Sequence, residues 1–228
     1  MNLASNSKAN VKKTRREQTR GEELANSLSH SVGLLAAIIA IPFLLMKIGG
    51  EDDTVLFVGV LIFACAIVFQ YASSALYHAL PQGRSKRVLR MIEHSAIFVL
   101  IAGTYTPFTL GILRDSWGIA LCILVWALAV VGVVLKSSNR LFHPQLSNAL
   151  FLLMGWLIVV AIKPMLESVP TAGLLWLLAG GIAYTVGVAF YAASSRVHYA
   201  HFAWHLFVMT GTACHFIAVY GYSAIPTT

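Results

Sequence analysis

The segment YAHFAWHLFVMTGTACHFIAVYGY, residues 199–222, is long enough and apolar enough to cross a membrane as one helix. A helix needs about 20 apolar residues, at 1.5 Å each, to cross the hydrocarbon core. His201 and His205 lie four residues apart near its start, and therefore on one face of the helix. Because an unsatisfied polar group is costly in hydrocarbon, these imidazoles need partners. They either form hydrogen bonds with other helices or bind a metal ion.

The composition of the whole chain indicates a multi-pass membrane protein. Of its 228 residues, 58% are hydrophobic and only 11% are charged, whereas soluble domains have about 25% charged residues. The apolar stretches are 28–48, 55–79, 89–111, 117–135, 147–162, 172–193 and 199–222. Each is close to the length of a membrane-spanning helix. We therefore predict an all-α fold with seven transmembrane helices, as a single domain of residues 22–228.

The basic residues predict the orientation of these helices. Of the 16 lysines and arginines, thirteen lie in residues 1–21 and in alternate loops, and only Lys47, Arg114 and Lys163 lie on the other side. The positive-inside rule then places the N-terminus in the cytoplasm and the C-terminus outside. Residues 1–21 are polar and basic, and we predict a disordered tail there. The basic patches are explained by topology and anionic lipids, so no nucleic-acid partner is expected.

This topology brings polar residues to a similar depth in the inner leaflet. His78 ends the second predicted helix, with Ser74 one turn away on the same face. Glu93 lies in the first turns of the third helix, and His201 and His205 lie in those of the seventh. An ionisable residue inside a membrane is by default a candidate for a functional site.

A metal site is one interpretation of this cluster. Three imidazoles can occupy three positions of a tetrahedron around Zn²⁺, and water then takes the fourth, as in catalytic zinc sites. Iron, copper or nickel are alternatives that also accept imidazole ligands. Glu93 is then the expected base or hydrogen-bond acceptor for the bound water. The other histidines are expected not to be ligands: His94, His143, His198 and His215.

A second polar stripe precedes the first predicted helix. Glu23, Asn26 and His30 are spaced three and four residues apart, so a helix places them on one face. We predict that they pack inward as hydrogen-bonding groups behind the metal ligands. The alternative is a solvated entry to the first helix.

Several motifs together resemble the hemolysin III family of bacterial membrane proteins, which belongs to one superfamily with the adiponectin and progestin receptors. The motifs are EELANSLSH (22–30), SSALYHALP (73–81), IEHSAIFVLIAGTYTPF (92–108), MGWL (154–157) and HFAWHLFVMTGTACHF (201–216). The resemblance covers about residues 22 to 222. It implies seven helices with a cytoplasmic N-terminus, and zinc bound in the cytoplasmic leaflet by His78, His201 and His205.

The resemblance also assigns Glu93 to the position of an aspartate associated with the zinc-bound water. Glutamate is longer than aspartate by one methylene, about 1.5 Å, so Glu93 can act as base, as direct ligand or as hydrogen-bonding partner of the site. Three functions remain open. The first is a zinc-dependent, ceramidase-like hydrolase of lipid amide or ester bonds, with Glu93 and Ser74 as catalytic groups. The second is a non-catalytic membrane-homeostasis sensor with structural zinc, and the third, least favoured, is a cytolysin. Membrane lipids are the expected partners, as substrate or ligand, and a bacterial inner membrane is the expected location.

Overall fold

The structure is a computed structural model that describes residues 16–50, 52–138 and 144–224. Within these residues the chain is all-helical. The elements are α1 (Arg20–Gly49), α2 (Thr54–Ala79), α3 (Arg84–Leu110), the π-helix η1 (Arg114–Gly118), α4 (Ile119–Ser137), α5 (Pro144–Gly155), the 3-10 helix η2 (Leu157–Ala161), α6 (Ile162–Ser168), α7 (Thr171–Ala193) and α8 (Ala200–Tyr222). The described residues contain seven helical spans of membrane length, which confirms the predicted fold class.

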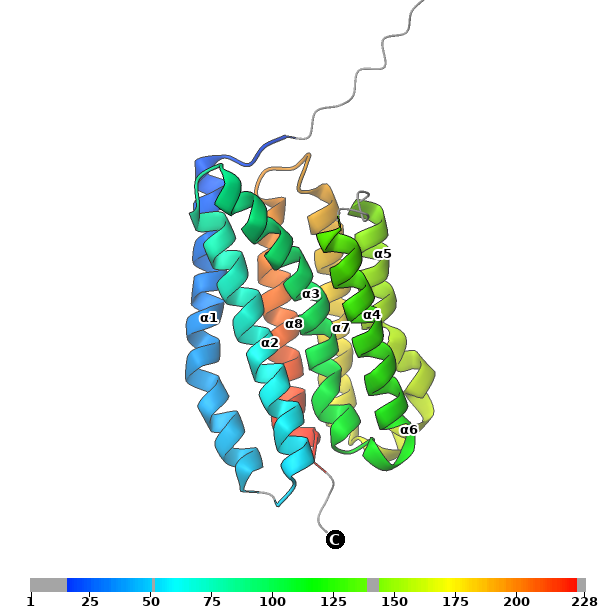
Figure 1. Cartoon of the computed structure of the whole chain (residues 1–228). Coiled ribbons are helices and arrows are strands. Elements are labelled where there is room, and N and C mark those ends of the chain that lie inside the picture. The colour runs from blue at the N-terminus through cyan, green and yellow to red at the C-terminus, as the bar shows by residue number, and fades with distance from the viewer. Residues whose placement is uncertain (1–15, 51, 139–143, 225–228) are drawn as a thin grey trace, which may run out of the picture.

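The helices form a closed bundle (Figure 1). Each helix from α1 to α4 packs on the next, α5 contacts α3, α4 and α7, and α8 packs against both α7 and α1. The start of α1, the end of α2 and the starts of α3 and α8 meet at one end, the upper end in Figure 1. This arrangement places the polar residues of four helices at the same level.

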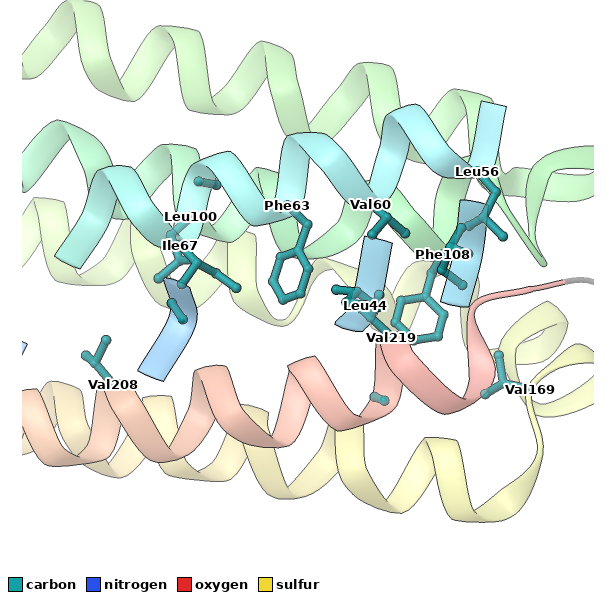
Figure 2. Packing of buried hydrophobic residues seen from close by; sticks show 14 of the residues in the cluster. Leu44, Leu56, Val60, Phe63, Ile67, Leu100, Phe108, Val169, Val208 and Val219 are labelled. Carbon is teal, nitrogen blue, oxygen red and sulfur yellow. The ribbon is translucent and has the colours of Figure 1, made fainter. Parts of the chain in front are cut away.

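Large apolar side chains fill the interior of the bundle and also cover its outer surface. Leu44, Phe63 and Val219 are fully buried between α1, α2 and α8 (Figure 2). On the outside, Met46 is 75% and Ile123 is 67% exposed. An outer surface of this kind is stable against lipid chains and not against water. The chain is therefore a multi-pass integral membrane protein.

The first helix begins earlier than its apolar stretch, at Arg20. A capping box fixes this start: the Thr19 hydroxyl accepts the Glu22 amide N–H at 3.2 Å, and the Glu22 carboxylate accepts the Thr19 amide N–H at 2.9 Å. Arg20 and Gly21 belong to the predicted tail but are helical. Residues 16–19 of that tail are described and are not helical, and residues 1–15 lie outside the described residues.

The fifth span was expected over 147–162, but it runs from Leu146 to Ser168 and is broken near Trp156. The buried Tyr105 hydroxyl fills the gap in the backbone hydrogen bonds. It lies 2.8 Å from the Met154 carbonyl oxygen and 2.9 Å from that of Gly155, and it accepts the Ile158 amide N–H at 3.0 Å. In a membrane, such a break requires a partner from a neighbouring helix.

A glycine sets the distance between α2 and α3. A methyl group at Gly103 would lie only 2.7 Å from the Ala66 Cβ, so no larger residue fits there without a shift of the helices. Small residues allow membrane helices to approach this closely. The two helices that pack this closely, α2 and α3, carry His78 and Glu93.

Candidate metal centre

Four ionisable side chains gather at the upper end of the bundle. His78 lies in the last turn of α2, Glu93 lies in α3, and His201 and His205 lie in the first two turns of α8. Each offers one ligand atom, and these atoms all lie within 4.8 Å of one another. The structure thus brings together the three histidines and the carboxylate that the sequence placed at one depth.

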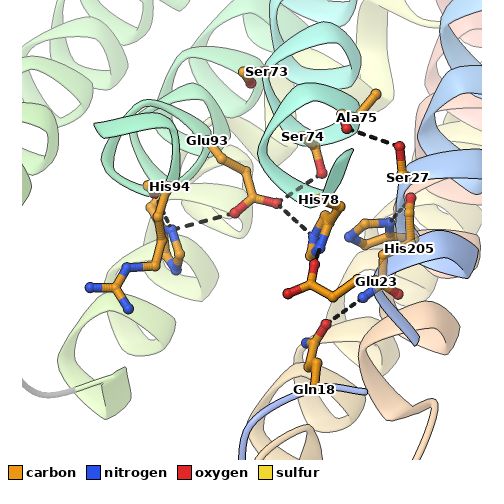
Figure 3. A network of polar contacts seen from close by, with 12 residues as sticks. Gln18, Glu23, Ser27, Ser73, Ser74, Ala75, His78, Glu93, His94 and His205 are labelled. Carbon is orange, nitrogen blue, oxygen red and sulfur yellow. Dashed lines mark hydrogen bonds and ion pairs between the residues drawn. The ribbon is translucent and has the colours of Figure 1, made fainter. Parts of the chain in front are cut away.

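The imidazole of His78 has a fixed tautomer. Its Nδ1 lies 2.7 Å from Oε2 of Glu23, which comes from α1 (Figure 3). A carboxylate is an acceptor, so Nδ1 carries the proton and donates it. The other Glu23 oxygen pairs with Nζ of Lys86 at 2.9 Å. Nε2 of His78 is therefore left with a free lone pair, and it has no hydrogen-bond partner.

The imidazole of His205 is held in the same way. Its Nδ1 lies 3.1 Å from the Asn26 carbonyl oxygen and 3.0 Å from the Ser29 hydroxyl, both on α1. A carbonyl only accepts hydrogen bonds, so Nδ1 of His205 is the donor and Nε2 carries the lone pair. Nε2 of His205 and Nε2 of His201 are both buried without a hydrogen-bond partner.

The buried Nε2 atoms of His78, His201 and His205 indicate whether a metal ion fits the site. Buried polar atoms in proteins are nearly always hydrogen-bonded, so three unpartnered imidazole nitrogens in one cluster need an explanation. A divalent metal ion explains them, since it accepts the lone pairs of neutral imidazoles. Three histidines without a thiolate are a ligand set typical of catalytic zinc. The hydrogen bonds to Nδ1 are also the outer contacts that orient histidine ligands in zinc sites.

Glu93 is buried and faces the histidines from α3. Its Oε1 accepts a hydrogen bond from the Ser74 hydroxyl at 2.8 Å and lies 3.4 Å from Nε2 of His78. Its Oε2 lies 3.6 Å from Nδ1 of His94. That Nδ1 donates instead to the Arg90 carbonyl oxygen at 2.5 Å, which leaves Oε2 free of hydrogen bonds.

The stripe predicted on α1 lies against the histidines and not in water. Asn26 and His30 are 0% and 1% exposed. Glu23 contacts His78, and the Asn26 backbone contacts His205. The His30 ring stacks on the His205 ring, with centroids 3.7 Å apart and planes 3° from parallel. Neither nitrogen of His30 has a hydrogen-bond partner, so His30 packs inward as predicted but forms no hydrogen bond. The side chain of Asn26 donates its hydrogen bond elsewhere, to Gln18 at 2.6 Å.

The other histidines are arranged differently. Nε2 of His94 accepts from the Tyr191 hydroxyl at 2.9 Å and Nδ1 donates to the Arg90 carbonyl oxygen, so neither ring nitrogen is left to bind a metal. His215 forms an interhelical hydrogen bond, from Nε2 to the Leu177 carbonyl oxygen at 3.1 Å. The side chain of His198 is 64% exposed. His143 lies outside the described residues.

Two residues that support the histidine cluster, Ser29 and Lys86, were not predicted from the sequence. Ser29 follows Asn26 by three residues and lies on the same face of α1, so the spacing that selected Asn26 would also have selected it. Nothing in the sequence distinguishes Lys86 from the other basic residues of the second predicted loop. Its role depends on the ion pair with Glu23, which no local pattern encodes.

Two cavities differ in their relation to this centre. An open cavity of about 360 Å³ reaches Glu93 and His201 from the upper end of the bundle. A smaller cavity of about 80 Å³ lies between α3, α5, α7 and α8, and its lining is mostly apolar. Only the larger cavity is lined by residues of the cluster.

Comparison with known proteins identifies relatives across nearly the whole chain. A sequence model of the family described as "Haemolysin-III related" matches residues 18–216. The hemolysin-3 homolog of Bacillus subtilis (strain 168) is 40% identical over 201 residues, which cover 88% of this chain and 94% of that protein. Hemolysin-3 of Bacillus cereus is 36% identical over 216 residues, with coverage of 95% and 98%. The monocyte to macrophage differentiation factor of Homo sapiens is 26% identical over 214 residues, with coverage of 88% and 84%. No solved structure matches the chain.

Proposed function

Because the chain belongs to the haemolysin-III-related family of membrane proteins, we propose that it is a zinc-dependent hydrolase of amide or ester bonds in membrane lipids. One observation carries this proposal. The three buried Nε2 atoms without hydrogen-bond partners lie in one cluster with the carboxylate of Glu93. Free lone pairs beside a buried carboxylate are what a hydrolytic metal site requires.

In this proposal His78, His201 and His205 hold the zinc ion through Nε2. Glu23 and the Asn26 carbonyl keep the proton of His78 and of His205 on Nδ1. When bound, zinc lowers the pKa of water to about 7 and polarises the carbonyl of the scissile bond. Three neutral histidines leave the charge of the ion intact, so the site also favours an ionised Glu93.

The proton transfers are assigned to Glu93. Oε1 is the carboxylate oxygen that faces the histidines, 3.4 Å from Nε2 of His78, so it is the atom assigned to take a proton from the attacking water. The Ser74 hydroxyl orients this oxygen through its hydrogen bond. The water oxygen bonds to the carbonyl carbon, and the C–N or C–O bond of the lipid breaks. Glu93 then returns the proton to the amine or alcohol that leaves, and the second product is a fatty acid. Ser74 thus positions the base in addition to any contact with substrate.

We also place the centre in the inner leaflet of a bacterial inner membrane. The basic side chains near the two ends of the bundle support this orientation. Arg84, Arg87 and Arg196 lie at the upper end, beside the metal centre, whereas Arg114 and Lys163 lie at the other end. Positive-inside bias then puts the upper end in the cytoplasm.

The test compares three variants with the wild-type protein, purified in detergent. We expect wild type to contain one zinc ion and to release fatty acid from a panel of ceramides, phospholipids and acyl amides. Glu93→Gln should keep zinc and lose turnover, because it preserves shape and removes the base. His205→Ala should lose both. His198→Ala is the matched control, since that side chain is exposed, and it should keep both.

The outcomes separate the proposal from its alternatives. Turnover by Glu93→Gln at the wild-type rate would remove Glu93 as base. Bound zinc without turnover on any lipid of the panel would favour a sensor in which zinc only joins α2 and α8. Release of dye from vesicles without lipid cleavage would favour a pore-forming activity, which the names of the Bacillus relatives suggest for those proteins.

A further inference from the structure

The cavity that leads to the metal centre has a basic rim. It is about 360 Å³ in volume, and its floor includes Glu93 and His201. The cations that line it come from the segment before α1 and from the first turns of α3: Arg16, Lys86, Arg87 and Arg90. A ligand that reaches the centre through this cavity passes these side chains.

Two of the four cations are already neutralised. Arg16 forms two hydrogen bonds to the Glu22 carboxylate, at 2.7 and 2.6 Å. Lys86 pairs with Glu23 at 2.9 Å and donates to the Leu80 carbonyl oxygen at 3.0 Å. The carboxylates of Glu22 and Glu23 neutralise these two cations, so neither cation offers a net positive charge to a ligand.

Arg87 and Arg90 have no such partner. Within residues 16–50, 52–138 and 144–224, no carboxylate lies within 4.0 Å of either guanidinium, and neither guanidinium donates a hydrogen bond. Both side chains are exposed at the cavity rim. The exposed carboxylate of Glu17 also lines the cavity and forms no ion pair among the described residues, so it offsets one of these two positive charges. Two neighbouring guanidinium groups still offer paired donors to an anion, and guanidinium is well matched to phosphate.

The spacing along α3 relates this anion site to the chemistry. Arg87, Arg90 and Glu93 follow one another at intervals of three residues, each about 60° around the helix from the last, and all three line the same cavity. At 1.5 Å per residue, Arg90 lies about 4.5 Å and Arg87 about 9 Å from Glu93 along the helix axis. In a glycerophospholipid, the glycerol joins the headgroup phosphate to the acyl ester, so the two groups are separated by a few bonds. A phosphate at the arginines places that ester near Glu93.

We propose that Arg87 and Arg90 bind the headgroup phosphate of the lipid, and that phospholipids are therefore the substrate class. The position of the acyl bond rests on the proposed hydrolase function, whereas the phosphate site does not. A neutral lipid such as ceramide or diacylglycerol has no anion for these arginines. Arg87 and Arg90 thus favour phospholipids over neutral lipids that reach the same site.

The test measures binding separately from turnover. The probes are dioctanoyl phosphatidylglycerol, dioctanoyl glycerol, which lacks the phosphate, and inorganic phosphate alone. Binding to the full chain in detergent is followed by tryptophan fluorescence, with and without zinc. A charge-assisted hydrogen bond contributes roughly a tenfold change in affinity. We expect Arg87→Gln/Arg90→Gln to bind phosphatidylglycerol at least about tenfold more weakly and dioctanoyl glycerol equally well.

Two controls distinguish this site from general attraction of anionic lipids to a basic surface. Arg84→Gln removes an exposed cation of the same helix that does not line the cavity, and it should leave phosphatidylglycerol affinity unchanged. Arg87→Lys/Arg90→Lys should restore part of the affinity, and unchanged binding of dioctanoyl glycerol shows that the double glutamine variant is folded. An equal loss in Arg84→Gln would overturn the proposal, as would equal affinity of wild type for both lipids.

The remaining outcomes separate the phosphate site from the hydrolase proposal. Inorganic phosphate that binds as tightly as phosphatidylglycerol would identify a free-phosphate site and overturn the lipid assignment. Loss of binding in the double glutamine variant, with no cleavage of any lipid by wild type, would support the phosphate site and contradict the hydrolase. Cleavage of ceramide and phosphatidylglycerol at equal rates by the double variant and wild type would contradict the substrate class alone.

Discussion

Exchange of Glu23 for glutamine tests how strongly α1 controls the proposed metal centre. The Glu23 carboxylate accepts from Nδ1 of His78 at 2.7 Å and from Nζ of Lys86 at 2.9 Å. Glutamine has the same size, but it offers one acceptor oxygen and one donor amide group. His78 and Lys86 then compete for a single oxygen. When Lys86 binds this oxygen, the amide N–H of the new glutamine faces Nδ1 of His78 as a donor. This favours the His78 tautomer with the proton on Nε2, the proposed ligand atom.

The expected effect is a weaker zinc site in a folded protein. Loss of an outer hydrogen-bond partner of a metal-bound histidine typically lowers affinity 10- to 100-fold, about 1.4 to 2.7 kcal/mol. Since Glu23 also holds Lys86, we expect the upper part of this range. The thermal stability of the zinc-loaded protein should fall with it, because metal that binds only the folded state stabilises that state.

The measurement is a competition titration with a chelator of known zinc affinity. Glu167→Gln is the matched control: the same chemical change on α6, at a side chain that is 63% exposed. Lys86→Met in the Glu23→Gln background removes the competitor and should recover part of the affinity. If Glu23→Gln binds zinc as tightly as Glu167→Gln does, Glu23 does not set the tautomer of His78 and the account of the centre fails.

Two further predictions concern the rest of the bundle. The Arg114 guanidinium holds the pKa of Asp53 below its usual value, through hydrogen bonds of 2.9 and 2.7 Å. This ion pair stabilises the folded protein fully above the unfolded pKa of Asp53, about 3.9, and the stabilisation is lost as pH falls through the lower pKa of the folded state. Asp53→Asn keeps the helix cap, so its melting temperature should lie below that of wild type near neutral pH and approach it under acid conditions; a constant difference at every pH would exclude the charge as the cause. Tyr105→Phe removes the hydroxyl that accepts from Ile158 and contacts the Gly155 carbonyl, and should cost about 1–3 kcal/mol. Thermal melts should detect this loss, with zinc content unchanged, and an unaltered melting temperature would show that the break in the fifth span needs no such partner.

The seven spans and the residues of the metal cluster follow from the sequence alone. Within lipid, backbone groups must be satisfied inside each segment, so an apolar stretch of sufficient length becomes a helix whatever its neighbours are. Helix direction alternates along the chain, which puts the end of α2 and the starts of α3 and α8 at one level. His78, Glu93, His201 and His205 could therefore be selected from their distance to the helix ends.

The contacts that give this cluster its chemistry were decided only by the tertiary structure. The Asn26 carbonyl that orients His205 was not predictable, since every helical residue has a carbonyl and only the rotation of α1 directs this one at the ring. The pairing of Lys86 with Glu23, which leaves Arg87 and Arg90 unpaired, likewise depends on how α3 lies against α1. Local spacing fixes which face of its own helix a residue occupies, whereas the neighbour on that face is fixed by the packing of segments that are distant in sequence.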